Sequence, residues 1–169
     1  MQHYGLSTRI LDWSSSFLPA LYFAVKNEEQ SDEPASLWAL NPGRLNKKQF
    51  PNTDTNIFHH NSHEVEEIVN SAFDAIHKGG NHVLATSGPE VDLRMFAQWS
   101  VFTIHESPIS MEDLQKELKE VFLHEIEIPM DDRCLLRQAL EIFGISHSRL
   151  FPDLQSLAVY LESQFITGK

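Results

Sequence analysis

Hydrophobic side chains change their spacing several times along this chain, from every third or fourth residue to every second. Apolar residues between Val65 and Ile76 follow the 3.6-residue period of an amphipathic helix. Residues 101–106 and 120–129 instead alternate with the two-residue period of a half-buried strand. A chain that mixes both periods in short segments folds as helices layered on a sheet. We therefore predict an α+β protein with a mixed central sheet and helices packed on it.

Gly, Pro and capping residues set the limits of the predicted elements. Ser62 is the predicted N-cap of the helix that contains Val65. Residues 44–61 are polar and aperiodic, so we expect an excursion from the core there. The other predicted elements are strands at 6–11, 36–41 and 82–86 and helices at 17–26, 110–118, 135–143 and 154–165. Together they predict a single domain over residues 1–169.

The length and the cysteine content limit the class of protein. With 169 residues, the chain can form one core that folds alone. No apolar run approaches the roughly 20 residues that cross a bilayer, and the first residues do not resemble a secretory leader. Cys134 is the only cysteine, which excludes an intrachain disulfide and fits a reducing compartment. We therefore expect a cytoplasmic protein without membrane contact.

The formal net charge of −11 limits the partners of the chain. Non-specific nucleic-acid binding needs a positive surface that displaces counterions, and Lys47–Lys48 is the only adjacent basic pair. Nucleic acid is therefore a disfavoured partner. An acidic surface is compatible with a protein partner.

Three segments, in order, resemble the signatures of one family. Residues 2–25 read QHYGLSTRILDWSSSFLPALYFAV, close to a QHYG-L-PTR-LLDW-T…ALYFA pattern. Residues 92–107 read DLRMFAQWSVFTIHES and match an R-I-x-x-Q-x-G-x-F-T pattern through Arg94 and Gln98. Residues 125–161 contain the turn GISHSRLFPDL between two predicted helices. Each segment is similar to part of the FRG domain, so the resemblance spans nearly the whole chain.

Two departures from the family pattern bear on function. The Phe-Arg-Gly motif that names the family lies upstream of the QHYG segment, and Met1 directly precedes Gln2 here. We therefore expect residues 1–169 to be the C-terminal portion of an FRG domain, without its N-terminal strand region. Ser100 replaces the glycine of the middle motif, next to Trp99, where a tight backbone approach would favour glycine.

The resemblance also implies a distant similarity to the ADP-ribosyltransferase fold, and hence NAD as a cofactor. In that fold a hydroxyl residue precedes an aromatic-rich helix, and a later strand carries a catalytic Glu or Gln. NAD needs donors for its amide, an aromatic surface for its ring and a polar group near its ribose. The implied catalytic residues are Gln98 and Arg9, and the implied cofactor contacts are His3, Tyr4, Thr8, Ser14 and Tyr22. An amide does not titrate, so Gln98 would orient or polarise the substrate.

The implied site residues also have structural interpretations, which stay open at this point. Arg9 and Asp12 are three residues apart and could pair with each other across the turn into the first helix. Trp13, Tyr22 and Phe23 fit a hydrophobic core better than a base-stacking platform.

A histidine group and the lone cysteine suggest two further chemistries. His59 and His63 have the i, i+4 spacing of two metal ligands, with His60 between them, but they lack the HExxH arrangement. A solvated histidine cluster is the favoured interpretation, so we predict no metal site. Cys134 lies beside Arg133 but has no identifiable base nearby, which favours a structural role.

Two functions therefore compete. The first is an enzyme of the ADP-ribosyltransferase type that binds NAD when the upstream strand of the family is present. The alternative is a non-catalytic protein-interaction or sensor module. FRG domains recur in bacterial and phage genomes, so the resemblance also implies a link to defence.

Overall fold

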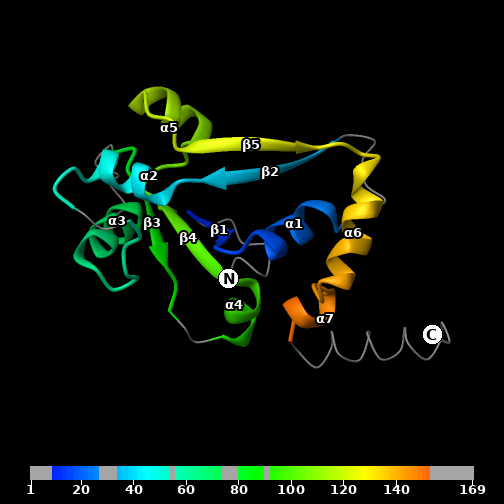
Figure 1. The fold of residues 1–169 in the computed structure, drawn as a ribbon. Coiled ribbons are helices and arrows are strands. Elements are labelled where there is room, and N and C mark those ends of the chain that lie inside the picture. The colour runs from blue at the N-terminus through cyan, green and yellow to red at the C-terminus, as the bar shows by residue number, and fades with distance from the viewer. Residues whose placement is uncertain (1–8, 27–33, 54–55, 74–79, 90–91, 153–169) are drawn as a thin grey trace. The chain divides into compact units, whose positions relative to one another are not determined.

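The computed structural model describes residues 9–26, 34–53, 56–73, 80–89 and 92–152 of the chain (Figure 1). In these ranges the strands are β1 (Ile10–Ser14), β2 (Ala35–Leu40), β3 (Val83–Ser87), β4 (Ser100–His105) and β5 (Leu123–Ile128). The helices are α1 (Phe17–Val25), α2 (Pro42–Gln49), α3 (His63–Phe73), α4 (Leu93–Gln98), α5 (Met111–Leu118), α6 (Asp132–Ile142) and α7 (His147–Leu150). The predicted α+β class is confirmed.

The chain divides into two compact units, each made of three segments. Unit 1 contains residues 1–13, 38–89 and 101–125, and unit 2 contains residues 14–37, 90–100 and 126–169. The prediction of a single domain over residues 1–169 stays a prediction.

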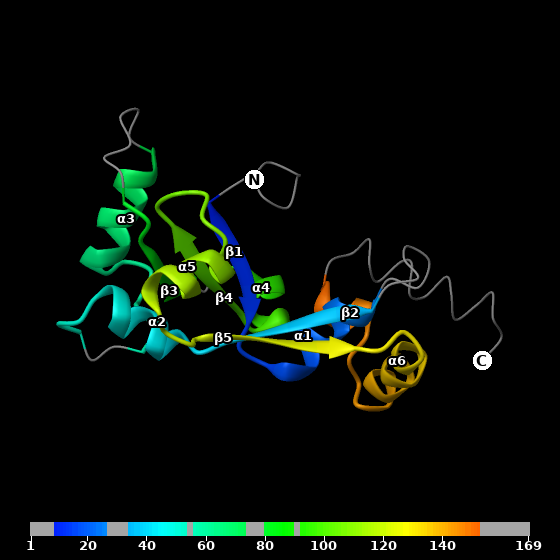
Figure 2. The same cartoon turned by 90° about the horizontal axis from the view of Figure 1, so that it is seen from above.

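The strands form two separate sheets, whereas we predicted one mixed central sheet. The first has the order β1-β4-β3, and β3 runs antiparallel to β4 from the pair Val83–His105 to the pair Ser87–Val101. Phe58 extends this sheet through a parallel bridge to Thr86. The second sheet is the two-stranded ribbon of β2 and β5, which lie side by side in Figures 1 and 2.

The β2–β5 ribbon explains why the single sheet was a wrong prediction. The alternating apolar residues of β5 predict one buried face, but His124, Glu125, Ile126 and Glu127 are all exposed. Since most of β5 has no layer packed over it, its alternation does not mark a face of a larger sheet.

Helix α2 lies where an aperiodic excursion was expected, and its start explains the error. Asn41 is the N-cap, and its side chain accepts a hydrogen bond from Arg44 N–H at 3.0 Å. Pro42 occupies the first turn, where no backbone N–H is needed. The helix buries only Leu45 and Asn46, too few residues to produce a clear hydrophobic period.

The core of unit 1 lies on both faces of β3. Val83 and Ala85 belong to a cluster with Leu45 from α2 and with residues of α5. Leu84 points to the opposite face and packs in a second cluster, which includes Ile68 of the predicted amphipathic helix. Strand β3 is therefore buried on both sides, as its continuous apolar run suggests.

The core of unit 2 joins α1 to α6. Leu21 and Val25 lie one helical turn apart on α1 and pack with Leu140 of α6. On α6, Leu140 is buried while Leu135 and Phe143 are exposed, so the apolar residues of this helix do not form one buried face.

Two further sequence predictions are settled only in part. Strand β1 runs from Ile10 to Ser14, and residues 6–8 of the predicted strand at 6–11 lie outside the described residues. The predicted helix at 154–165 lies outside the described residues. Among the helices in the described part of the chain, none has the length and apolar character required to cross a bilayer.

Candidate functional site around Phe151

The predicted site residues are distributed over both units. Ser14, Tyr22 and Gln98 belong to unit 2, and Arg9 belongs to unit 1. The predicted cofactor contacts His3, Tyr4 and Thr8 lie outside the described residues. Each unit is therefore considered by itself.

In unit 2 the structure brings Ser14 and Gln98 together. The Ser14 hydroxyl lies 2.8 Å from the Gln98 backbone carbonyl oxygen and 3.0 Å from the Ser16 backbone carbonyl oxygen, and it can donate to either. The Ser15 N–H donates to the Trp99 carbonyl oxygen at 2.9 Å. Hydrogen bonds between positions 84 residues apart therefore hold the start of α1 against the end of α4.

Gln98 is the last residue of α4, whereas the fold analogy places it on a strand. Its side-chain nitrogen donates to the Leu150 carbonyl oxygen at 3.0 Å. Leu150 ends α7, so this bond ties α7 to α4. Its amide can support binding by orienting nearby groups, but it already has this structural hydrogen bond.

Phe151 is the centre of a stacked cluster in unit 2. The guanidinium carbon of Arg94 lies 4.4 Å from the centroid of the Phe151 ring. The His147 ring stacks on Phe151 with a centroid distance of 4.5 Å and an interplanar angle of 18°. Phe23 makes an edge contact with the same ring at 6.0 Å. The cluster of Phe23, Arg94, His147 and Phe151 therefore unites all three segments that carry the family resemblance.

Tyr22 lies beside this cluster and is half-buried. Its ring makes an edge contact of 5.7 Å with Phe23, and it packs against the α1–α6 core. Burial raises the pKa of the Tyr22 hydroxyl above its ordinary value, so the hydroxyl remains a neutral donor at physiological pH.

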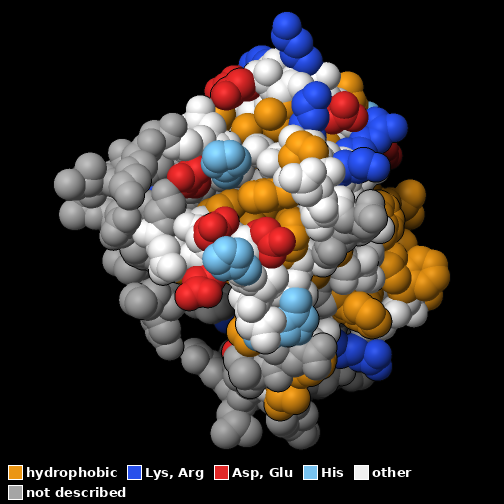
Figure 3. Space-filling model, turned by 90° about the vertical axis from the view of Figure 1, so that its left-hand side faces the viewer, with side chains coloured by type: hydrophobic (Ala, Val, Ile, Leu, Met, Phe, Trp, Pro, Cys, Tyr) orange, Lys and Arg blue, Asp and Glu red, His pale blue; other side chains and the backbone are white. Residues whose placement is uncertain are grey.

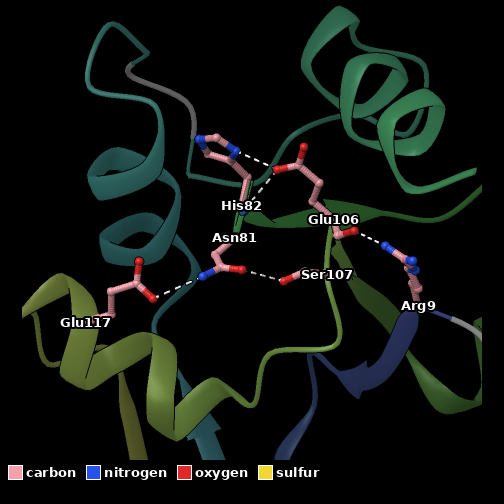
Figure 4. A network of polar contacts seen from close by, with 6 residues as sticks. All are labelled: Arg9, Asn81, His82, Glu106, Ser107 and Glu117. Atoms are coloured by element: carbon pink, nitrogen blue, oxygen red, sulfur yellow. Dashed lines mark hydrogen bonds and ion pairs between the residues drawn. The ribbon is translucent and has the colours of Figure 1, made fainter. Parts of the chain in front are cut away.

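In unit 1, Arg9 belongs to the polar network shown in Figure 4. Its guanidinium Nη1 donates to the Glu106 carbonyl oxygen. Among the described residues, no ion pair joins Arg9 to Asp12, so the predicted local pairing is not formed.

Glu106 anchors the same network through its side chain. The His82 ring nitrogen Nδ1 lies 2.7 Å from Glu106 Oε2, and the His82 backbone N–H donates to that oxygen at 3.2 Å. The Ser107 hydroxyl donates to Asn81 Oδ1 at 2.7 Å. Val83 and His105 form the last residue pair of the β3–β4 register, and these contacts join the residues that directly adjoin that pair. The network therefore holds the end of this hairpin together.

A second polar chain runs through the buried face of β4. The Trp13 indole N–H donates to the Thr103 hydroxyl at 3.1 Å, and that hydroxyl lies 3.1 Å from His105 Nε2. Burial lowers the pKa of His105 below its ordinary value, and a hydrogen bond with the Ile109 backbone offsets part of this shift. His105 is therefore a neutral partner of the Trp13–Thr103 pair.

The histidine group considered for metal binding lies near the start of α3. The rings of His59 and His60 are 4.3 Å apart, and His63 Nε2 lies 3.3 Å from Glu67 on the exposed side of the helix. Acidic and histidine side chains lie together on the face shown in Figure 3. Within the described ranges, no group of three or more His, Cys, Asp or Glu residues is placed to hold a metal ion.

Comparison with known proteins adds one finding. Residues 1–33 match the FRG domain family. This match confirms the resemblance for the opening segment, while the FRG assignment of residues 92–107 and 125–161 stays a prediction. No curated protein and no solved structure matches the chain.

The FRG segment supplies Ser14, Tyr22 and Phe23 to unit 2. Sequence reasoning overlooked the role of Phe151, since its contacts join helices far apart in the chain. It noted Arg94 only as a motif position. The two motifs that contain Arg94 and Phe151 were the available signal, because both occur in segments that resemble the FRG family.

Proposed function

We propose that unit 2 binds NAD, with Ser14, Tyr22 and Gln98 beside the cofactor. The hydrogen bond from the Ser14 hydroxyl to the Gln98 backbone carbonyl carries this proposal, because it brings together two residues, one with a hydroxyl and one with an amide side chain, that are expected at an NAD site. Tyr22 lies on the adjacent helix α1 and offers a neutral hydroxyl and an aromatic ring. Arg9, His3, Tyr4 and Thr8 stay predictions, since the proposal rests on unit 2 alone.

The finer form of the proposal is an ADP-ribosyltransferase-like activity in the intact family architecture. In that reaction the bond between nicotinamide and ribose breaks, nicotinamide leaves, and an acceptor oxygen or nitrogen bonds to the ribose and loses its proton. The hydrogen bond from Gln98 to Leu150 favours a positioning role for this glutamine over proton transfer. We place this activity in the cytoplasm and retain the defence link as part of the proposal.

Binding of NAD is tested by thermal unfolding of the full chain with millimolar NAD. A ligand that binds the folded state raises the melting temperature. Tyr22→Leu removes the ring and the hydroxyl, and we expect it to weaken NAD binding about tenfold. Phe50→Leu, a comparable loss of an aromatic ring in unit 1, is the control. Absence of any shift for the wild-type chain would overturn NAD binding, and nicotinamide release is the separate readout for transfer.

A second candidate function is protein interaction through α4. This helix buries none of its residues. The exposed fractions are 72% for Leu93 and 54% for Phe96 on the helix and 62% for Trp99, which is its C-cap. Exposed apolar side chains that are close together mark surfaces for protein partners. This is the observation that favours the non-catalytic interaction or sensor module.

The interaction function is tested with the double substitution Leu93→Ser and Phe96→Ser. We expect the wild-type chain to retain one protein at one-to-one stoichiometry and the double variant to lose it. Val121→Ser, at another exposed apolar residue, should retain the partner. A wild-type chain that stays monomeric and retains no stoichiometric protein would count against this function.

A further inference from the structure

The positively charged guanidinium group of Arg94 has no ion-pair partner in the described part of unit 2. Its guanidinium lies over the Phe151 ring, and none of the ion pairs among the described residues includes it. The carboxylate of Asp92 accepts a hydrogen bond from the Arg94 backbone N–H at 2.9 Å and so acts as a helix cap. Within the described ranges, no carboxylate therefore neutralises the charge of Arg94.

The Nε–H group of Arg94 is buried and has no hydrogen-bond partner among the residues that the structure describes. Buried polar groups in native proteins are nearly always paired, so an unpaired donor requires an explanation such as an ion or a ligand. Stacking on an aromatic ring fixes the plane of a guanidinium group while its N–H donors remain in that plane. Arg94 is thus held in a fixed orientation with one unused donor.

Arg94 also lies beside the residues proposed to contact NAD. It precedes Gln98 by four residues on α4, so the two side chains share one side of the helix. Gln98 in turn contacts Ser14 through its carbonyl oxygen. The Arg94 guanidinium would therefore be placed to contact the pyrophosphate of a dinucleotide bound beside these residues.

We propose that Arg94 binds a phosphate group, and specifically the pyrophosphate of a nucleotide ligand, with Phe151 as the surface that orients it. Planar N–H forks bind phosphate oxygens in a bidentate manner, which a lysine cannot reproduce. His147 stacks on the same Phe151 ring and helps to fix that ring in place. This inference rests on the proposed nucleotide site and names the part of the ligand that unit 2 recognises.

The test measures binding of inorganic pyrophosphate and of NAD to the full chain by calorimetry. Arg94→Met keeps an unbranched side chain against Phe151 and removes the charge, and we expect at least about tenfold weaker pyrophosphate binding. Arg94→Lys keeps the charge without the fork and should give an intermediate loss. Lys48→Met removes one positive charge at an exposed position of unit 1 and should bind as the wild type does. Succinate is the comparison ligand for carboxylate binding.

Each outcome bears on one proposal or on both. Equal pyrophosphate affinity of the wild type and Arg94→Met overturns the role of Arg94. Equal NAD affinity of these two proteins also overturns that role, but it leaves the proposed NAD function intact. Pyrophosphate binding that depends on Arg94, without NAD binding, supports Arg94 and overturns the NAD function. Failure of the wild type to bind either ligand overturns both, and preference for succinate overturns the assignment to phosphate. If circular dichroism shows that Arg94→Met is unfolded, Arg94→Lys replaces it, and pyrophosphate affinity equal to that of the wild type then overturns the role of the Arg94 fork.

Discussion

Asn46 is fully buried in unit 1, although amide side chains are usually found at the surface. Its side-chain nitrogen donates to the carbonyl oxygens of Asn56 and Ala85, both at 2.9 Å. Its side-chain oxygen accepts from the Ala85 N–H at 2.8 Å. Asn46 therefore satisfies both backbone groups of one β3 residue, as a neighbouring strand would do.

Substitution of Asn46 by alanine should destabilise the chain strongly. Asn46→Ala leaves the buried Ala85 N–H unpaired, and we expect the free energy of unfolding to fall by about 2–3 kcal/mol. Urea denaturation measures this change. Asn52→Ala, at an exposed position, should change it by less than about 0.5 kcal/mol. A loss for Asn46→Ala as small as that control would show that water replaces the side chain.

The buried His105 makes stability depend on pH. Its pKa is lowered in the folded state, so below its ordinary value of 6.5 the unfolded chain binds a proton that the folded chain resists. The contribution of His105 is complete above pH 6.5 and is lost as the pH falls toward its folded-state pKa. We expect the acid-side slope of unfolding free energy against pH to decrease in His105→Gln. The exposed substitution His63→Gln should retain that slope, and an unchanged slope in both variants would contradict the assignment.

At the scale of elements, α4 ends in an unusual backbone conformation. Trp99 is the C-cap of this helix and has φ of 53°, in the left-handed region that favours glycine. The family pattern placed the glycine at Ser100, one residue later. The position that requires positive φ therefore carries a bulky residue, and its side chain is mostly exposed.

Glycine at position 99 should relieve this strain. We expect Trp99→Gly to unfold with a free energy about 1 kcal/mol higher than Trp99→Ala, because alanine still carries the cost of the left-handed conformation. Thermal or urea unfolding of the two variants measures the difference. At Glu112, in the first turn of α5, the order should reverse, since alanine favours an ordinary helix. The same order at both positions would mean that Trp99 is not strained.

The elements that were predictable from sequence are those with strong periodic patterns. Helices α1, α3 and α5 and strands β3 and β4 lie close to their predicted positions. Helices α2 and α4 escaped prediction because they bury few or no apolar residues and depend on the side-chain caps Asn41 and Asp92. Local patterns report burial, so elements held mainly by their ends carry a weak signal.

The candidate site was predictable only as a set of residues. The resemblance selected Ser14 and Gln98, and the structure places them in contact across 84 positions. It could not select Phe151 as the shared partner of Arg94 and Phe23, because these contacts arise from tertiary packing. A sequence pattern likewise cannot show that the side chains of Arg9 and Gln98 donate to backbone carbonyl groups.

On the scale of the whole molecule, the two units are interleaved along the chain. The unit boundaries fall after residues 13, 37, 89, 100 and 125, and both β2 and β5 continue across a boundary. The chain therefore passes from one unit to the other within both strands of the β2–β5 ribbon.

We expect the entire chain to unfold in one cooperative transition. Trp13 and Trp38 belong to unit 1, so the fluorescence of Trp99→Phe reports on that unit alone. Its midpoint in urea should coincide with the midpoint of far-ultraviolet circular dichroism, which reports on both units. Two separated midpoints would contradict the single-domain prediction for residues 1–169.

The interleaved segments also determine the order of events during synthesis. Unit 1 receives its last segment at residues 101–125, and unit 2 begins its last segment only at residue 126. A nascent chain that pauses on the ribosome before Val101 therefore lacks a segment of each unit. Strand β3 would emerge with one edge still unpaired, and Met111 and Leu114 of α5 would not yet pack on Val83 and Ala85, so this stage of synthesis exposes apolar surface that favours aggregation.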